Sequence, residues 1–226
     1  MNDNIKKKCI VLLSGGLDSA TVLNIALESY QVTALVFDYG QRHKFEILSA
    51  NEIAKAANVP IKLITIDLGQ FGNSALTDNI EVPKNQDIGK EIPITYVPVR
   101  NTIFLSYALA FAEVNNIFDI FIGVNALDYS GYPDCRPEFI EAFEKMANEG
   151  TKFAQGDEKI KIHTPLISFT KAEIILTGTK LNVNYKLTHS CYDPSIDGLS
   201  CGECDACILR KEGFASAGIK DPTSYI

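Results

Sequence analysis

The chain alternates between two patterns of apolar positions. Short apolar runs recur, and each is followed by a segment whose apolar residues return every three or four positions. The runs predict strands at 9–13, 32–37, 61–66, 119–123 and 160–163, and the periodic segments predict helices after 17, over 44–58, over 102–114, from 137 and from 170. Strands that alternate with helices favour a parallel sheet. We therefore expect an α/β protein with a doubly wound, Rossmann-like parallel sheet.

Two segments depart from this pattern. The segment from Thr102 to about Val114 is apolar nearly all round, which predicts a helix buried on every side. Asn101 before it is a suitable N-cap. Residues 68–93 carry several Gly and Pro residues among polar ones and have no period. Because so long a connection is uncommon unless it is functional or mobile, we expect partial disorder without ligand and a lid over the substrate.

Composition narrows the class of protein. The 226 residues suffice for one sizeable core, and 46% of them are hydrophobic, which is typical of a globular protein. The formal charge of -7 favours a small-molecule substrate over nucleic acid. No apolar run is long enough for a membrane span, and the run behind the basic N-terminus is too short for a secretory signal. We expect a cytoplasmic protein with no membrane or nucleic-acid partner, whose six cysteines do not form disulfides.

The most informative stretch follows the first predicted strand. Ser14-Gly15-Gly16-Leu17-Asp18-Ser19 places a strand, a tight turn and a helix in direct succession. The two glycines permit conformations in which successive amides converge on one point, and the helix directs its partial positive charge there. These are the parts of a phosphate-binding loop; an ordinary turn without ligand is the alternative. The expected nucleotide-binding residues are Leu13, Ser14, Gly15, Gly16, Leu17, Asp18, Ser19, Ala20, Thr21, Val22 and Leu23.

This loop resembles the pyrophosphate-binding loop of the N-type ATP pyrophosphatases. Those enzymes cut ATP between its α and β phosphates to activate an oxygen as an adenylate. The stretch is not a Walker A loop, because no Gly-Lys-Ser/Thr sequence closes it. It is not a dinucleotide fingerprint either, because the Gly-x-Gly-x-x-Gly pattern is absent. The resemblance implies that ATP is a co-substrate.

Two cations stand at predicted helix starts, where a positive charge is unfavourable unless an anion lies nearby. Arg100 precedes the helix at 102–114. Lys171 follows Thr170, a predicted N-cap that forms a capping box with Glu173. Both cations are candidates for contacting ATP phosphates. The alternatives are a surface ion pair for Arg100 and a solvated side chain for Lys171.

The loop after the strand at 119–123 is dense in acids, hydroxyls and rings. At the carboxyl end of a strand such a loop suits a flat polar heterocycle, with rings against its faces and carboxylates on its N–H groups. Alternatively, these side chains only hold the loop together. The candidate substrate-binding residues are Asp128, Tyr132, Asp134 and Arg136.

Four cysteines lie close together near the C-terminus, with the spacing Cys-x9-Cys-x2-Cys-x2-Cys. They are Cys191, Cys201, Cys204 and Cys207. Four thiolates can form a closed tetrahedral zinc site, which leaves no open position for water and would therefore be structural. An iron–sulfur cluster, redox thiols and unrelated buried cysteines are the alternatives. We expect one structural Zn²⁺ per chain in a segment at 186–226, packed on the core of an ATP pyrophosphatase-type domain at 1–185.

Several stretches together resemble the 7-cyano-7-deazaguanine synthase family of the queuosine-precursor pathway. They are Ser-Gly-Gly-Leu-Asp-Ser (14–19), Phe-Asp-Tyr-Gly-Gln-Arg-His (37–43), Val-Pro-Val-Arg-Asn (97–101), Asp-Tyr-Ser-Gly-Tyr-Pro-Asp-Cys-Arg (128–136), Thr-Lys-Ala-Glu (170–173), and the four-cysteine segment with Leu-Arg (209–210). The phosphate loop alone indicates only the superfamily. The Ser-Gly-Tyr-Pro-Asp-Cys-Arg run and the cysteine spacing resemble the corresponding features of this one family.

The resemblance implies an ATP-dependent carbon–nitrogen ligase. Such an enzyme converts 7-carboxy-7-deazaguanine and ammonia to the 7-cyano compound through an adenylated carboxylate and an amide. The implied catalytic residues are Asp18, which would help to hold Mg²⁺, and Arg100 and Lys171, which would stabilise developing charge. We expect a homodimer because that is the commonest assembly of soluble oligomers.

Two other functions are compatible with the phosphate loop. A tRNA thiolase of the same fold would need a basic tRNA surface, and the acidic net charge argues against one. A non-catalytic nucleotide sensor would bind ATP without producing pyrophosphate or AMP. Turnover therefore distinguishes the sensor from an enzyme.

Overall fold

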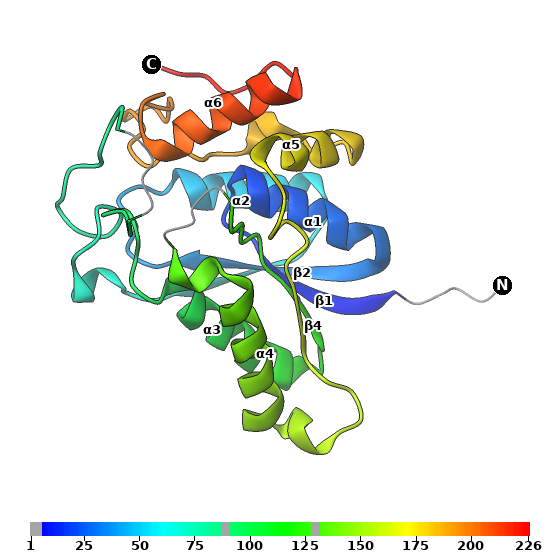
Figure 1. Cartoon of the computed structure of the whole chain (residues 1–226). Coiled ribbons are helices and arrows are strands. Elements are labelled where there is room, and N and C mark those ends of the chain that lie inside the picture. Colours follow the sequence, from blue (N-terminus) through cyan, green and yellow to red (C-terminus); the bar gives the residue numbers. More distant parts are fainter. Residues whose placement is uncertain (1–5, 87–90, 128–131) are drawn as a thin grey trace.

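The computed structural model describes residues 6–86, 91–127 and 132–226. Within them, five strands form a parallel sheet in the order β3-β2-β1-β4-β5 (Figure 1). The strands are β1 (Lys7–Leu12), β2 (Tyr30–Asp38), β3 (Ile61–Thr65), β4 (Asp119–Phe121) and β5 (Lys161–His163). The predicted parallel α/β sheet is confirmed.

Helices cover both faces of this sheet (Figure 1). On one side are α1 (Leu17–Ser29), α2 (Phe45–Ala56), α5 (Lys171–Lys180) and α6 (Asp205–Ala217), and on the other are α3 (Arg100–Asn115) and α4 (Pro137–Gly150). Short 3₁₀ turns are η1 (Gly69–Phe71), η2 (Pro133–Cys135), η3 (Lys152–Gln155) and η4 (Tyr185–Leu187).

The central strand shows why the sequence reads as continuous apolar runs. Ile10 and Leu12 of β1 pack in the core under α3 and α4, whereas Cys9, Val11 and Leu13 pack in the core under α1 and α2. Successive side chains of a strand point to opposite faces, so a strand covered on both faces needs apolar residues at every position.

The strand order creates a switch point beside β1. The chain passes from β1 outward to β2 and β3, then returns to the other side of β1 for β4 and β5. Loops from the carboxyl ends of β1 and β4 therefore run to opposite sides of the sheet. In open α/β sheets the crevice between such loops is where ligands bind.

Helix α3 differs from the prediction in two respects. It begins at Arg100, after Val99 in a left-handed conformation with φ 51°, so Asn101 lies in its first turn and does not cap it. It is also buried on one face only, because it packs against the sheet with that face, and Tyr107 and Val114 are 44% and 79% exposed. The predicted N-cap and the all-round burial were therefore wrong.

The connection after β3 is packed over its described part. Ala75 is fully buried, and the Arg42 guanidinium donates to two backbone carbonyls of the connection. The amide of Asn85 donates to a carbonyl of the four-cysteine segment over 2.9 Å. Residues 68–86 are thus anchored to the rest of the fold, because the Arg42 side chain and the Glu203 carbonyl oxygen bind parts of their backbone. Residues 87–90 lie outside the described part, and the lid stays a prediction.

The C-terminal third of the chain packs on the same core as α1. The capping box of α5 is confirmed, since Thr170 Oγ1 accepts from the Glu173 amide and the Glu173 carboxylate accepts from the Thr170 amide. Phe214 of α6 is buried in the core that contains α1 and α5.

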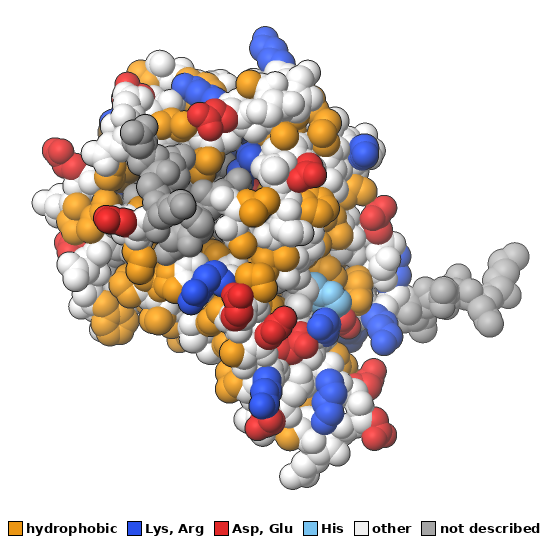
Figure 2. Space-filling model, viewed as in Figure 1, with side chains coloured by type: hydrophobic (Ala, Val, Ile, Leu, Met, Phe, Trp, Pro, Cys, Tyr) orange, Lys and Arg blue, Asp and Glu red, His pale blue; other side chains and the backbone are white. Residues whose placement is uncertain are grey.

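On the face in Figure 2, acidic and basic side chains lie intermixed on the lobe around α4. No helix in the described ranges has both the length and the apolar character needed to cross a bilayer.

Candidate active site and metal centre

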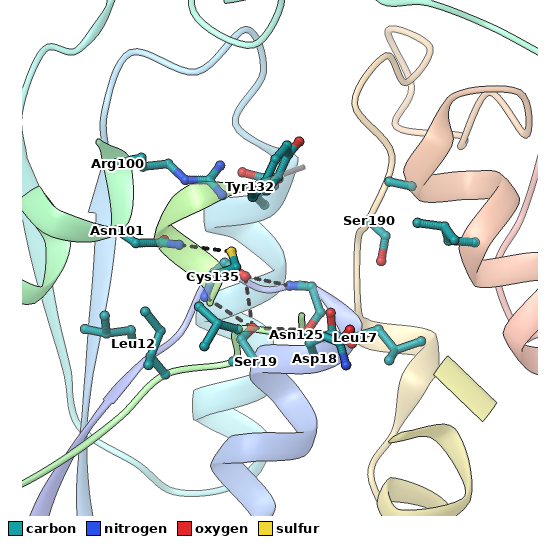
Figure 3. Close-up of a pocket in the computed structure, with 18 of the residues that line it drawn as sticks. Leu12, Leu17, Asp18, Ser19, Arg100, Asn101, Asn125, Tyr132, Cys135 and Ser190 are labelled. Carbon is teal, nitrogen blue, oxygen red and sulfur yellow. Dashed lines mark hydrogen bonds between the residues drawn. The ribbon is translucent and has the colours of Figure 1, made fainter. Parts of the chain in front are cut away.

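A cavity of about 230 Å³ lies at the carboxyl ends of β1 and β4, at the switch point of the sheet. Its wall comes from the loop after β1, the first turns of α2 and α3, the loop after β4, and the segment before the cysteines (Figure 3). The predicted site residues in this wall are Ser14, Gly16, Leu17, Asp18, Ser19, Arg100, Tyr132 and Lys171. The fold therefore brings together residues that are more than 150 positions apart in sequence.

Gly15 shows why the phosphate loop needs glycine. Its φ is +87°, and a Cβ at this position would lie 2.2 Å from the carbonyl oxygen of Glu46 and 2.8 Å from the amide nitrogen of Ala50. Any side chain would push the loop away from α2. The amide of Ser14 donates to Ser19 Oγ over 3.2 Å, and the two hydroxyls lie 3.0 Å apart. The loop is thus built tightly around the start of α1, where the helix dipole favours an anion.

The other predicted nucleotide-binding residues lie behind the wall. Leu13 and residues 20–23 are buried in the core under the loop. Thr21 Oγ1 donates to the carbonyl oxygen of Leu17 over 2.9 Å and lies 2.9 Å from the Tyr185 hydroxyl. These side chains support the loop, and as nucleotide contacts they stay predictions.

Asp18 and Lys171 form an ion pair in the cavity wall. Lys171 Nζ donates to both carboxylate oxygens of Asp18 over 2.9 Å. The capping box places Lys171 in the first turn of α5. A Cβ on Gly213 of α6 would lie 2.3 Å from Lys171 Cγ, so α6 packs directly against the lysine stem. The pair places one anion and one cation beside the loop at 14–19, and contacts of the two residues with ATP stay a prediction.

A second group in the wall contains Tyr39, Glu46 and Arg100. Val99 is β-branched, and its left-handed conformation is rare and typical of functional regions. It starts α3 at Arg100, whose guanidinium carbon lies 5.9 Å from the centre of the Tyr39 ring. Burial raises the pKa of Glu46 to about 7, and the Arg100 charge opposes part of that increase. Near neutral pH this carboxyl group is close to half ionised.

The aspartate and cysteine after Tyr132 hold the start of α3. The Asn101 amide donates to Asp134 Oδ2 over 3.0 Å, and the Asn101 side chain donates to the Asp134 carbonyl oxygen and to Cys135 Sγ. Cys135 lines the cavity, and burial raises the pKa of its thiol to about 12, so the group stays protonated (Figure 3). The Asp134 carboxylate thus accepts from a free amide in the first turn of α3, which is the role predicted for the Asn101 side chain.

Two of the four predicted substrate-binding residues lie outside the cavity wall. Asp134 is buried behind it, and Arg136 is an exposed residue whose Nε donates to the Pro133 carbonyl oxygen. Tyr132 is in the wall, 3.1 Å from the Thr95 hydroxyl. Asp128 lies outside the described residues. The substrate contacts of all four stay predictions.

The sequence reasoning missed Glu46 and Asn125. Glu46 lies within a helical pattern and carries no motif of its own, so only the close approach of Gly15 to α2 reveals that it faces the cavity. Asn125 is in the loop after β4, and its side chain donates to the carbonyl oxygens of Leu166 and Phe169. Its position at a strand's carboxyl end was the available signal.

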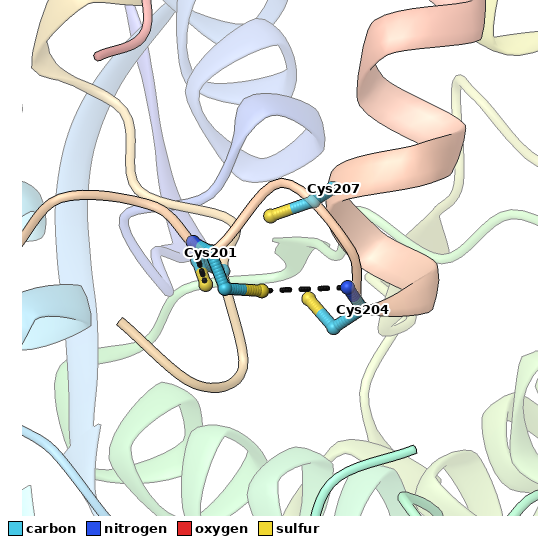
Figure 4. A group of neighbouring side chains, drawn as sticks. Cys201, Cys204 and Cys207 are labelled. Atoms are coloured by element: carbon cyan, nitrogen blue, oxygen red, sulfur yellow. Dashed lines mark hydrogen bonds between the residues drawn. The ribbon is translucent and has the colours of Figure 1, made fainter. Parts of the chain in front are cut away.

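The four cysteines of the C-terminal segment converge. Their sulfur atoms all lie within 4.8 Å of one another, and the side chains are buried (Figure 4). Gly202 turns between two of them with φ +76°. Backbone amides donate to the sulfurs: Cys201 N to Cys191 Sγ over 3.2 Å, and Cys204 N to Cys201 Sγ over 3.4 Å. Hydrogen bonding from the Cys191 and Cys207 thiols lowers the pKa of Cys204.

This arrangement fits a bound metal ion. The four sulfurs lie within 4.8 Å of one another, and Cys191 and Cys201 accept amide hydrogen bonds, which favour the thiolate form that binds metals. Four soft ligands around one point could hold a metal such as zinc. The other two cysteines, Cys9 and Cys135, are buried elsewhere.

The sequence is similar to known proteins along nearly its whole length. The family model of queuosine biosynthesis protein QueC matches residues 8–218. A 7-cyano-7-deazaguanine synthase from Desulfatibacillum aliphaticivorans is 60% identical over 100% of both chains. One from Syntrophus aciditrophicus is also 60% identical and covers 96% of each chain. Among solved structures, NMN synthetase from Francisella tularensis is 19% identical, with a TM-score of 0.49 over 97% of this chain and 80% of its own.

Proposed function

We propose that this chain, which belongs to the queuosine biosynthesis protein QueC family, makes a nitrile in the cavity at its sheet edge. It is an ATP-dependent ligase that forms 7-cyano-7-deazaguanine (preQ0) in queuosine biosynthesis, and the alternatives of a tRNA thiolase or a nucleotide sensor are not favoured. The observation that carries this conclusion is 60% identity over the full length of a 7-cyano-7-deazaguanine synthase.

The substrates we propose are 7-carboxy-7-deazaguanine, ammonia and ATP. A carboxylate is a poor electrophile, and transfer of AMP to its oxygen creates a good leaving group. Ammonia then displaces AMP to give the amide. A second activation, at the amide oxygen, allows that oxygen to leave and the nitrile to form. Such a reaction needs positioning and charge neutralisation more than covalent catalysis.

The residues of the cavity wall suit these steps. We assign the pyrophosphate to the loop at 14–19 and to the N-terminus of α1. Arg100 and Lys171 are suited to neutralise charge on the phosphates and on the activated carboxylate. Asp18 is suited to hold Mg²⁺, which would help to neutralise the charge of the phosphates of bound ATP. The Tyr132 side of the wall is our proposed site for the deazaguanine ring.

We propose that the four cysteines hold one structural Zn²⁺. Residues 186–226 would then form a segment that the metal ion stabilises and that packs on the ATP-binding domain at 1–185. Four thiolates close the coordination sphere and leave no position for catalysis. His189 lies just before the first cysteine, and its amide donates to the Gly15 carbonyl oxygen over 2.9 Å. The metal would therefore hold one wall of the cavity against the phosphate loop. Thiol ligands persist in a reducing compartment, which supports a cytoplasmic location.

We also propose a homodimer that uses the outer face of α3. Tyr107 and Val114 are large, exposed apolar residues seven positions apart, which places them on the same face of the helix, and exposed apolar faces mark interaction sites. Light scattering should give twice the chain mass for the wild type. Val114→Asp should shift the protein to the monomer mass, because a charge would be buried in the interface. A wild-type monomer at micromolar concentration would contradict the proposal.

The proposed function is tested by incubating the purified protein with ATP, Mg²⁺, ammonium and 7-carboxy-7-deazaguanine. Mass spectrometry should detect the 7-cyano product, and nucleotide consumption should require the acid. AMP and pyrophosphate as products would identify the α–β bond as the one cut. Absence of the nitrile, from protein that holds its metal and binds ATP, would contradict the assignment of the substrate.

A further inference from the structure

Glu46 is an acidic side chain in the wall of a cavity to which we assign anionic reactants. It lies in the first turn of α2 and lines the cavity beside Tyr39 and Arg100. In the part of the chain that the structure describes, no hydrogen bond or ion pair within 4.0 Å is found for its carboxylate. The other acid of the wall, Asp18, has Lys171 as its partner. The Glu46 carboxylate therefore reaches the cavity without neutralisation by a direct contact.

Such a carboxylate opposes the binding of the two large reactants. ATP and the 7-carboxy group are both anions, and a negative side chain beside them weakens their binding. Burial adds to this cost, because it disfavours the charged form. We assign the N–H groups of the deazaguanine ring to the Tyr132 side of the wall and Mg²⁺ to Asp18, so the partner left for this carboxylate is another cation. Ammonium is the one reactant that enters as a cation.

The position of Glu46 suits that role. Its backbone carbonyl packs against Gly15 of the phosphate loop, and its side chain interacts electrostatically with Arg100. It thus lies between the two places to which we assign the phosphates and the substrate carboxylate. The adenylate would form between them, and its nucleophile must arrive there.

We propose that Glu46 is the ammonium site and removes the proton that makes ammonia nucleophilic, a role that rests on the function proposed above. Ammonium transfers one proton to the carboxylate and becomes ammonia. The nitrogen lone pair forms the C–N bond at the adenylate carbonyl carbon. The C–O bond to the nucleotide breaks, and AMP leaves with that oxygen, the bonding electrons and the second proton lost from nitrogen. The products are the amide, AMP and the protonated carboxyl group of Glu46.

The test compares Glu46→Gln with Glu52→Gln, which removes an exposed carboxylate from the same helix. Exchange of labelled pyrophosphate into ATP that requires 7-carboxy-7-deazaguanine measures adenylation in the absence of ammonia. Amide and nitrile formation measure the ammonium step. We expect Glu46→Gln to adenylate within about threefold of the wild type and to lose about 100-fold in kcat/KM for ammonium, the usual size of a general-base effect. Glu52→Gln should match the wild type in both assays.

Hydroxylamine separates proton removal from other defects. It is largely uncharged at neutral pH and needs no base to become a nucleophile. Glu46→Gln should therefore form the hydroxamic acid at a rate close to that of the wild type. This result would also show that the variant is folded and makes the adenylate.

The pH dependence supplies an independent readout. Tyr39 and Arg100 interact electrostatically with Glu46, and Asp18, Lys171 and His189 line the same cavity. Burial raises the pKa of Tyr39, so its hydroxyl does not titrate between pH 6 and 8. Wild-type kcat/KM for total ammonium should rise with pH and level off above about 7, where Glu46 is ionised. In Glu46→Gln it should keep rising tenfold per pH unit, because only free ammonia reacts.

Three results would overturn the inference. Equal losses of adenylation and amide formation in Glu46→Gln would place Glu46 in ATP or acid binding. An equal loss with hydroxylamine would exclude a role in proton removal, and wild-type kinetics with ammonium would exclude any role. A wild-type protein that shows no acid-dependent exchange would refute the proposed function itself, and this inference with it.

Discussion

Replacing Cys204 with Ser is expected to abolish binding of the proposed metal ion and to unfold the C-terminal segment. Cys204 lies at the start of α6, and its sulfur is within 4.8 Å of the other three. Serine offers a harder, less acidic ligand that zinc binds poorly in a thiolate site. Structural zinc supplies about 10–16 kcal/mol of binding free energy that is also folding free energy, so even a partial loss is large against the stability of a domain.

The damage should spread beyond the cysteines. Ala75 and Val82 of the connection after β3 share a hydrophobic cluster with them, and Lys84 forms a 2.8 Å ion pair with Asp193. His189, in the cavity wall, is held by the same segment. Loss of the metal should therefore loosen the connection and one cavity wall together, so nitrile formation should fall with metal content.

Metal analysis and thermal unfolding measure this prediction. The wild type should carry about one zinc ion per chain, and Cys204→Ser close to none. A stability loss of about 3 kcal/mol would lower Tm by roughly 6–12 °C in a chain of this size. Cys9→Ala, which removes a buried thiol from β1, should keep the metal. A fully metallated, equally stable Cys204→Ser protein would show that the cluster does not depend on four thiolates.

The sequence predicted best what is local. The phosphate loop was recognisable because strand, turn and helix follow one another within a few residues, and Gly15 adopts the positive φ that such a turn needs. The capping box at Thr170 was predicted for the same reason, since its partners are three residues apart. The parallel sheet with helices on both faces followed from the alternation of strands and helices, whereas the strand order was not predicted.

The errors have a common physical cause, which is competition from distant residues. Asn101 has the side chain of an N-cap, but Asp134 from another loop binds its amide, and the left-handed Val99 starts the helix two residues earlier. Glu46 looked like an ordinary helix residue, because its place beside the cavity depends on contact with Gly15. No local pattern in the sequence carries these arrangements.

Replacing Lys171 with Met is expected to reduce adenylation by about 1000-fold, which corresponds to about 4 kcal/mol of transition-state stabilisation. In the structure Lys171 donates to both oxygens of Asp18. If ATP binds together with Mg²⁺, Asp18 would be free to bind the metal ion and Lys171 to bind the phosphates. The charge on the phosphates grows as pyrophosphate leaves, so a cation fixed there stabilises the transition state more than bound ATP.

The measurement is the exchange of labelled pyrophosphate into ATP that requires 7-carboxy-7-deazaguanine, at saturating ATP. Lys180→Met, at the exposed end of the same helix, is the matched control and should leave exchange unchanged. Lys171→Arg should recover only part of the rate, because α6 packs directly on the lysine stem and leaves little room for a guanidinium. Full exchange by Lys171→Met would contradict its assignment to the phosphates.

A double-mutant cycle with Asp18→Asn decides whether the pair works as a unit. Each single variant leaves its partner without a counter-charge, so each loss includes the cost of an unpaired group. If the two side chains act on one metal-bound triphosphate, the double variant should lose little more than the worse single variant. Losses that multiply would show that the two residues contribute independently. The ion pair would then be only a contact of the ligand-free protein.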